Sequence, residues 1–239
     1  MSSARSPSSS TLSRPVPAAR GSYELSLTDV WFDHDGVDAL CGTSLVIRSG
    51  AVTVIAGANG SGKSTALAVL AGLLAPRRGK VSVPPRVRRA LVVQRSEVSD
   101  RMPLTVRDVV TMGRWSSTGL LRRLGAEDRD VVDECIGLVG LDGFRDRPLT
   151  ALSGGQRQRA FLAQGLAQRA DVVLLDEPTT GLDAATRAVF ADVLLAERDR
   201  GATVVCVSHD DAALAAADHV IRLEAGRVVS AGPGRVHHR

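Results

Sequence analysis

The sequence is short of aromatic residues, which make up 3% of its 239 positions, and of lysine, which occurs only at Lys63 and Lys80. A nucleic-acid surface that stacks bases on aromatic rings therefore lacks its usual partners. Arginine supplies almost all of the basic charge, and the net charge is only +4. The arginines fall in small groups, which favours solvated faces over a nucleic-acid footprint, and no nucleic-acid partner is expected.

Cysteine and long apolar runs are also scarce. Cys41, Cys135 and Cys206 are odd in number and far apart, which fits neither a disulfide framework nor a cysteine-based zinc site. They are expected to be small buried residues of a reducing compartment. The longest apolar run, at 65–75, falls short of the ~18 residues that a membrane span needs. If this protein acts at a membrane, another chain crosses it.

The two ends of the chain differ in composition from its middle. Residues 1–22 are rich in Ser, Pro and Arg and contain no hydrophobic stretch, so they predict a disordered extension and not a secretory signal. With 44% hydrophobic residues in the whole chain, residues 23–232 can bury one substantial core, or a core with an appended subdomain. Residues 233–239 are expected to form a short tail.

Four strand-sized runs are apolar throughout their middle and end in a residue that can take part in a site. They are "VTVIAG", "ALVVQ", "DVVLLDE" and "ATVVCVSH", which end at Gly57, Gln94, Asp176 with Glu177, and His209. Each is followed by a helix-like segment, which predicts parallel strands buried on both faces. In such α/β sheets ligands bind beyond the carboxyl ends of the strands.

Two other patterns surround this core. Tyr23–Phe32 begins with period-two alternation, and "RLEAGRVVSAG" reads as a hairpin that turns at Ala225-Gly226, so antiparallel strands are expected beside the parallel ones. Between Gln94 and Asp171, helical signals replace strand signals. They begin near Thr105, continue through "AEDRDVVDECIGLVG" and resume after Ser153. They predict a helical subdomain at about 96–169 that is inserted into the core.

The stretch "GANGSGKST" matches G-x-x-x-x-G-K-[ST] and lies between a predicted strand and a predicted helix. Its glycines let the loop wrap with N–H groups inward, where Lys63 can reach the β- and γ-phosphates and Ser64 can bind Mg²⁺. The predicted phosphate site comprises Gly57, Ala58, Asn59, Gly60, Ser61, Gly62, Lys63, Ser64 and Thr65.

The run "VVLLDEP" supplies the acidic partner of this loop. Asp176, at the strand end, can hold the Mg²⁺ shell, as Walker-B aspartates do. Glu177, one residue later, can orient or deprotonate a water that attacks the γ-phosphate. His209 and Gln94 are candidates to sense that phosphate and the attacking water.

The stretch "LSGGQ" has two interpretations. Ser153 and Gln156 form a capping box, which begins a helix and needs no ligand. A cap alone does not require Gly154 and Gly155, each of which costs about 1 kcal/mol against alanine inside a helix. The paired glycines therefore suggest that another group approaches the backbone closely.

Taken together, the phosphate loop, Gln94, "LSGGQ", "VVLLDE", "GLD" at 181–183 and His209 have the order and spacing of an ABC-type ATPase. The chain resembles the nucleotide-binding subunit of ABC transporters over about 23–232. The resemblance implies a P-loop NTPase fold: a RecA-like parallel-sheet core with an antiparallel β subdomain and an inserted α-helical subdomain. It also implies ATP and Mg²⁺ as cofactors, with Mg²⁺ held by Ser64, Gln94 and Asp176.

The same resemblance implies a homodimer that closes on ATP. The signature helix of one subunit would cap the nucleotide on the phosphate loop of the other, and Asp183 would lie along that interface. The implied catalytic residues are Glu177, His209, Lys63 and Gln94. The signature residues acting in trans are Ser153, Gly154, Gly155 and Gln156.

The sequence differs from the family pattern at the residue that stacks on the adenine base. Similar proteins stack an aromatic residue, usually Tyr, on the base shortly after the first strand. Here "DVWFDHDG" places His34 there, with Trp31 and Phe32 just before it. Either His34 or one of these neighbours is expected to stack on the base.

The helical insert bears on the task of the ATPase. Its stretches "QRSEV", "PLTVRDVV" and "MGR" are most similar to the subunits of zinc and manganese importers, whereas "LSGGQRQRAFLAQGLAQ" also resembles iron-siderophore importer ATPases. A peripheral protein at the cytoplasmic face of a bacterial membrane is therefore expected. It would import zinc or manganese through permease subunits and would meet the solute-binding protein only indirectly. Chelated iron is the alternative, and a soluble nucleic-acid- or ribosome-associated ABC protein is a further one.

Overall fold

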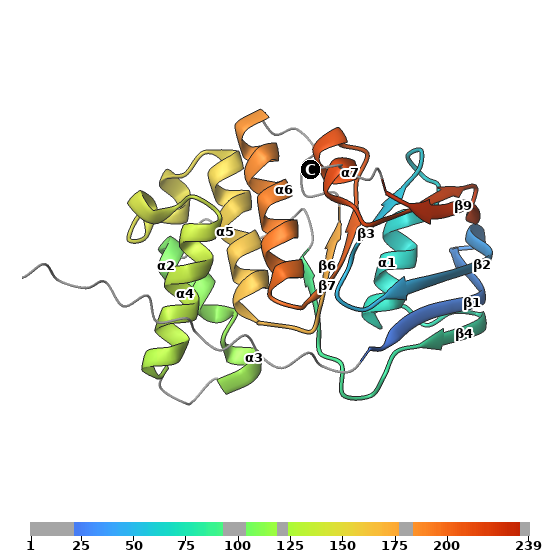
Figure 1. The fold of residues 1–239 in the computed structure, drawn as a ribbon, viewed down its shortest axis with the longest axis horizontal. Coiled ribbons are helices and arrows are strands. Elements are labelled where there is room, and N and C mark those ends of the chain that lie inside the picture. Colours follow the sequence, from blue (N-terminus) through green and yellow to red (C-terminus); the bar gives the residue numbers. More distant parts are fainter. Residues whose placement is uncertain (1–21, 93–103, 119–123, 177–183, 235–239) are drawn as a thin grey trace, which may run out of the picture.

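The structure is a computed structural model that describes residues 22–92, 104–118, 124–176 and 184–234. Two β-sheets and the helices between and around them form the molecule (Figure 1). The α/β architecture, with parallel and antiparallel strands, agrees with the fold class predicted from the sequence. The predicted extension at 1–22 lies almost entirely outside the described residues, and the subdomain boundaries stay predictions.

The larger sheet has six strands in the order β5-β6-β7-β3-β8-β9, and only the β8–β9 pair is antiparallel. The four apolar runs of the sequence form the parallel strands β3, β5, β6 and β7, as predicted, and β8 also pairs parallel with β3. The strands are β3 (Val52–Ala56), β5 (Arg89–Val92), β6 (Val172–Asp176), β7 (Thr203–Val207), β8 (His219–Glu224) and β9 (Arg227–Pro233).

Strands β3, β6 and β7 lack hydrophobic alternation because both of their faces are buried, whereas β5 also carries the exposed Arg89. Successive side chains point to opposite faces of a strand, and in β7 Val204 and Cys206 join one apolar core while Val205 and Val207 join the other. Strands β3 and β6 divide their side chains in the same way. The sheet therefore separates two cores.

One of these cores lies between the large sheet and a smaller antiparallel sheet of order β2-β1-β4. The three strands are β1 (Glu24–His34), β2 (Val37–Arg48) and β4 (Arg78–Ser82). Helix α1 (Lys63–Ala71) contacts strands of both sheets and buries residues such as Leu67 and Leu70 between them. This position explains why α1 is apolar on nearly every side.

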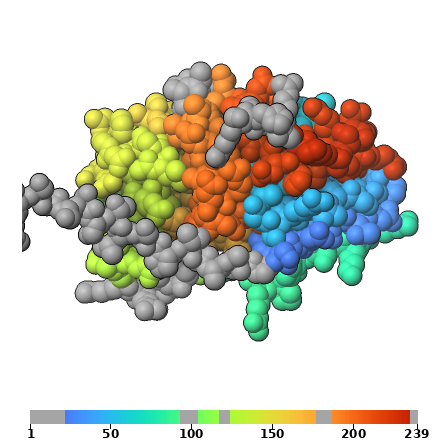
Figure 2. Space-filling model, in the orientation of Figure 1, coloured from blue at the N-terminus to red at the C-terminus, as the bar shows by residue number. Residues whose placement is uncertain are grey.

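The other core is covered by the remaining helices. Helices α2, α4 and α5 pack on one another at one end of the molecule, and α6 lies between them and the sheets (Figures 1 and 2). No helix in the described part of the chain has the length and apolar character needed to cross a bilayer. The helices are α2 (Val106–Met112), α3 (Trp115–Thr118), α4 (Ala126–Leu138), α5 (Gly154–Ala167), α6 (Ala184–Asp199) and α7 (Asp211–Ala216), with 3-10 turns at Asp142–Phe144 and Leu149–Ala151.

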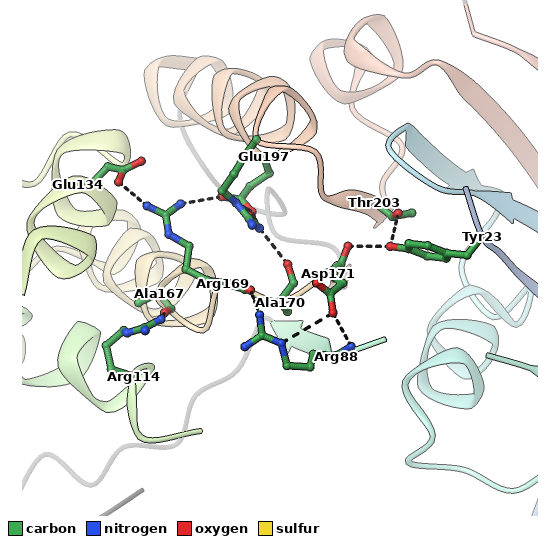
Figure 3. Close-up of polar contacts among 11 residues, drawn as sticks. Tyr23, Arg88, Arg114, Glu134, Ala167, Arg169, Ala170, Asp171, Glu197 and Thr203 are labelled. Carbon is green, nitrogen blue, oxygen red and sulfur yellow. Dashed lines mark hydrogen bonds and ion pairs between the residues drawn. The ribbon is translucent and has the colours of Figure 1, made fainter. Parts of the chain in front are cut away.

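A buried carboxylate joins the helical end to the core (Figure 3). The Glu197 side chain of α6 is only 2% exposed and accepts hydrogen bonds from Arg200, which also donates to the Ala170 carbonyl. Arg169, just after α5, pairs with Glu197 and with Glu134 of α4. Burial alone would lower the pKa of the Arg169 guanidinium, but its hydrogen bond and attraction to the two glutamates hold that pKa above its usual value. The cluster ties three helices together.

The Glu197→Ala variant is expected to lower the free energy of unfolding by about 3 kcal/mol, because it removes the buried partner of two arginines. Glu134→Ala is the matched control, since it removes the other carboxylate on Arg169 from a side chain that is 50% exposed. That control should lose less than about 1 kcal/mol. Urea denaturation of both variants measures the difference, and equal losses would show that burial does not set the strength of this cluster.

The cysteines follow the sequence prediction in two of three places. Cys135 and Cys206 are buried, whereas Cys41 is only half-buried, so the prediction was wrong for Cys41. Burial raises the pKa of the Cys135 thiol to about 12 and that of the Cys206 thiol well above its usual value. Both buried thiols therefore stay protonated, which makes them unreactive core residues.

Candidate nucleotide site

The motif at 57–65 covers the loop that joins β3 to α1 and the first residues of the helix. Strand β3 ends at Ala56 and α1 begins at Lys63, so "GANGSGKST" has the strand–loop–helix setting that a phosphate loop needs. The Ser61 N–H donates to the Ala58 carbonyl at 3.1 Å, which tightens the loop on itself. The N-terminus of α1 adds a partial positive charge at the place where phosphates would bind.

The two polar side chains that begin α1 lie differently. Lys63 is 4% exposed, and its Nζ donates to the Ala58 carbonyl at 2.8 Å. The Ser64 hydroxyl donates to Asp176 Oδ1 at 2.8 Å. Because Asp176 is the last residue of β6, this bond joins the phosphate loop to the strand that the sequence predicted as its acidic partner. Hydroxyl and carboxylate oxygens are the ligands that Mg²⁺ prefers.

A cavity of about 370 Å³ opens beside the phosphate loop. Its volume falls within the roughly 300–1,000 Å³ of small-molecule sites. The end of β1 and the start of β2 form the second wall. Sequence reasoning found only His34 there, and the turn-forming "DHDG" was the available signal for the other residues of this wall. The cavity is lined by His34, Val37, Asp38, Ala39, Asn59, Gly60, Gly62, Lys63, Ser64 and Thr65.

His34 is held at the edge of this cavity. Its Nε2 lies 3.2 Å from the Thr65 hydroxyl, and the Phe32 ring packs edge-on against the imidazole with 4.9 Å between ring centroids. Phe32 packs against the buried core, and the Trp31 ring lies under the Arg227 guanidinium. Of these three rings, only that of His34 lines the cavity wall.

The predicted catalytic residues fall partly within the described chain. Strands β6 and β7 pair Asp176 with Val207, so the exposed His209, two residues further on, follows β7 at the same edge of the sheet. Lys63 lies at the phosphate loop, whereas Gln94 and Glu177 lie outside the described residues, as does Asp183 of the predicted dimer interface, and the roles of these three stay predictions.

The signature stretch begins α5 with a complete capping box. The Gln156 N–H donates to the Ser153 hydroxyl at 3.3 Å, and the Ser153 N–H donates to Gln156 Oε1 at 3.0 Å. Ser153 and Gly154 are exposed, neither lines the cavity, and a Cβ at Gly154 would meet no described atom within 4 Å. The described part of the chain therefore gives no steric reason for glycine at 154, in keeping with close approach by another molecule.

A phosphate loop between β3 and α1, with the strand-end Asp176 beside its serine, defines a P-loop nucleotide-binding protein. The family model described as ABC transporter matches residues 40–180. The chain therefore belongs to the ABC transporter family and is one of its ATPases, as the sequence predicted.

Curated relatives cover most of the chain. It is 40% identical to the manganese transport system ATP-binding protein MntA of Synechocystis, over 77% of this chain and 75% of the relative. It is 39% identical to the zinc transport system ATP-binding protein TroB of Treponema pallidum, over 79% and 73%. It is 36% identical to the hemin import ATP-binding protein HmuV of Rhodococcus jostii, over 92% and 78%.

Solved structures agree with the fold. The dimeric structure of MJ0796, a bacterial ABC transporter cassette, superposes with a TM-score of 0.74 at 27% identity, covering 89% of this chain and 99% of that chain. CbiO1 from Clostridium perfringens, part of the ABC transporter complex cbiONQ, gives 0.73 at 28% identity over 87% and 88%. The architecture of an ABC cassette is therefore shown for this chain.

Proposed function

We propose that this chain hydrolyses ATP to energise the import of manganese or zinc through a separate membrane permease. The observation that supports this is its 39–40% identity, over more than three quarters of its length, to manganese and zinc transport ATP-binding proteins. The chain would sit at the cytoplasmic face of the membrane, bound to permease subunits, and would meet a solute-binding protein only through them. It would work as a homodimer, the state of the MJ0796 cassette.

The phosphate loop would hold the triphosphate of ATP. The backbone N–H groups of 57–62 and the N-terminus of α1 would surround the phosphates. Lys63 is already at the loop, where its ammonium donates to the Ala58 carbonyl, and it would exchange that bond for the β- and γ-phosphate oxygens. The second wall, around Asp38 and Ala39, would contact the nucleoside.

The oxygen ligands on this edge of the sheet fit Mg²⁺. Ser64 and Asp176 already lie within hydrogen-bond distance of one another, and both offer the hard oxygen donors that this cation takes. Together with Gln94 they would hold it. The cation supplies positive charge that neutralises the β- and γ-phosphates during transfer.

The hydrolytic step would use the residues that follow β6 and β7. Glu177 would accept a proton from the attacking water, and His209 and Gln94 would sense the γ-phosphate and that water. His209 is exposed at the end of β7, two residues past the strand. The partner subunit's Ser153 and the backbone of its signature stretch would cover the γ-phosphate.

His34 would stack on adenine. His34→Ala is expected to weaken nucleotide binding about tenfold, because stacking on an aromatic ring is worth about 1–3 kcal/mol per base. His34→Tyr, which keeps a ring, should bind at least as tightly as wild type. Fluorescence titration with labelled ADP measures both variants, and unchanged affinity in His34→Ala would assign the base to another residue.

Chelated iron is the second candidate cargo. The hemin import protein of Rhodococcus jostii is 36% identical, and it covers 92% of this chain, more than either metal relative does. The higher identity to the manganese and zinc proteins favours free divalent ions. Because the cargo need not touch this chain, cargo uptake has to be measured directly.

The test is uptake of radiolabelled Mn²⁺, Zn²⁺ and a ferric siderophore by cells that lack this chain. We expect Mn²⁺ or Zn²⁺ uptake to fall to background, to return with the wild-type chain and to stay absent with Lys63→Ala. Loss of ferric siderophore uptake alone would establish the iron alternative. Normal uptake of all three, with purified protein that retains DNA at physiological salt, would favour the nucleic-acid alternative.

A further inference from the structure

The turn between β8 and β9 is bonded to the phosphate loop from outside the cavity. The Gly226 N–H donates to the Ser61 carbonyl at 3.0 Å, and Ser61 itself is 4% exposed. Neither Ala225 nor Gly226 lines the cavity. A turn some 160 residues further along the chain therefore fixes one peptide of the loop that would wrap the phosphates.

The other side of the same residue is bonded to the second wall of the cavity. The Gly226 carbonyl accepts hydrogen bonds from the Cys41 N–H at 2.9 Å and from the Thr43 hydroxyl at 2.5 Å. Thr43 is fully buried, and both residues follow Ala39 on β2, which lines the cavity. One residue thus joins the phosphate loop to the strand that carries the nucleoside wall.

The packing around this junction leaves no room for side chains. Gly226 has φ +72°, and a Cβ there would lie 2.7 Å from the Ala39 carbonyl oxygen. A Cβ at Gly57 would overlap the carbonyl oxygen of Leu223 on β8. The first glycine of the phosphate motif is therefore required by the packing of the hairpin, independently of any phosphate.

We propose that Gly226 is a positioning residue for the nucleotide site: by bonding Ser61, Cys41 and Thr43 at once, it holds the two walls of the cavity at the spacing that nucleotide requires. The proposal rests on the assignment of 57–65 as the phosphate loop. A site that is held in its binding geometry loses less entropy on binding. Weakening the bonds of Gly226 should therefore lower the affinity for nucleotide more than it disturbs the rest of the fold.

The first test compares Gly226→Ala with Gly50→Ala in the full chain. Gly50 is the matched control, because its φ is +68° in another turn between strands and a Cβ there would meet nothing within 4 Å. Both variants should lose thermal stability from left-handed strain, and Gly226→Ala should lose more because its Cβ also meets the Ala39 carbonyl oxygen. Binding is measured with fluorescent ADP in the presence of Mg²⁺, at a temperature where circular dichroism shows both variants to be folded. Gly226→Ala should bind ADP at least about tenfold more weakly than wild type, whereas Gly50→Ala should bind it as wild type does.

Thr43 keeps the proposal testable if Gly226→Ala does not fold. Thr43→Val preserves shape but removes one donor to Gly226, and should weaken ADP about fivefold. Thr43→Ser retains the hydroxyl and should restore wild-type affinity. Amide exchange of 57–65 should quicken in Gly226→Ala and Thr43→Val and stay unchanged in Gly50→Ala, a difference that a merely structural role would not produce.

The proposal is overturned if the folded Gly226→Ala and Thr43→Val both bind ADP as wild type does. It is also overturned if Gly50→Ala weakens ADP as much as Gly226→Ala. Lys63→Ala separates this result from failure of the phosphate-loop assignment. If Lys63→Ala also binds normally, the loop assignment is wrong; if it alone loses affinity, the loop binds phosphate and only the role of Gly226 is rejected.

Discussion

Replacement of Glu177 by glutamine is expected to slow ATP hydrolysis at least ~100-fold while ATP binding stays intact. Asp176 ends β6 with its carboxylate at the Ser64 hydroxyl, so that residue would hold the metal ion. Glu177 is the next residue in the chain and would serve the attacking water. Glutamine has nearly the same shape and can bond a water, but it cannot accept the proton that hydrolysis releases.

The measurement is phosphate release together with size-exclusion chromatography in ATP. The Glu177→Gln variant should remain as an ATP-bound dimer, since on the proposed mechanism the dimer would close before hydrolysis and would need hydrolysis to reopen. Glu127→Gln, the same change on an exposed position of α4, is the control and should hydrolyse ATP as wild type does. Turnover of Glu177→Gln near that of wild type would place the general base elsewhere.

The parts of the fold that could be predicted from the sequence are those that local patterns determine. Strands β3, β6 and β7 are apolar throughout because both faces are buried, and that burial is visible in the sequence. The start of α5 was visible too, because a capping box is formed by residues three apart. The strand order of the large sheet was not, since no local pattern says that β3 lies between β7 and β8.

The features that the sequence hid are contacts between distant segments. Glu197 lies in the charged stretch "AERDRG", where a solvated face is the ordinary expectation, yet it pairs with Arg169 and Arg200 and is only 2% exposed. Arg77 belongs to the arginine groups that were expected on solvated faces, and it is exposed as expected. It is 57% exposed but pairs with Asp33 and Asp38, the second of which lines the cavity. Local charge patterns predict exposure only where no other element packs on them.

The Ser153→Arg variant is expected to reduce hydrolysis by about 100-fold or more without changing ATP binding to the monomer. Ser153 is exposed at the start of α5 and lines no part of the cavity of its own chain, so the monomer site is untouched. An arginine there would prevent a second subunit from bringing its γ-phosphate to the signature backbone. Loss of monomer binding would instead mean that the signature acts on its own chain.

Ser153→Arg also removes the cap of α5, and this effect on stability must be separated from the loss of the proposed contact with the other subunit's nucleotide. Thr105 begins α2 with the same kind of capping box, so Thr105→Arg loses a comparable cap, worth about 1 kcal/mol, at a different helix. Both variants should lose similar stability by thermal denaturation. Only Ser153→Arg should lose hydrolysis, because only α5 is proposed to face another subunit's nucleotide.

Mixing inactive variants tests the composite site directly. In a dimer of Ser153→Arg with Lys63→Ala, one site combines an intact phosphate loop from the first subunit with an intact signature from the second. The mixture should therefore hydrolyse ATP faster than either variant alone. If both motifs served one chain, no subunit in the mixture would hold a complete pair and activity would stay absent. The two anion-binding motifs of this chain would then be separate devices and not, as we propose, two halves of a site that one copy cannot close.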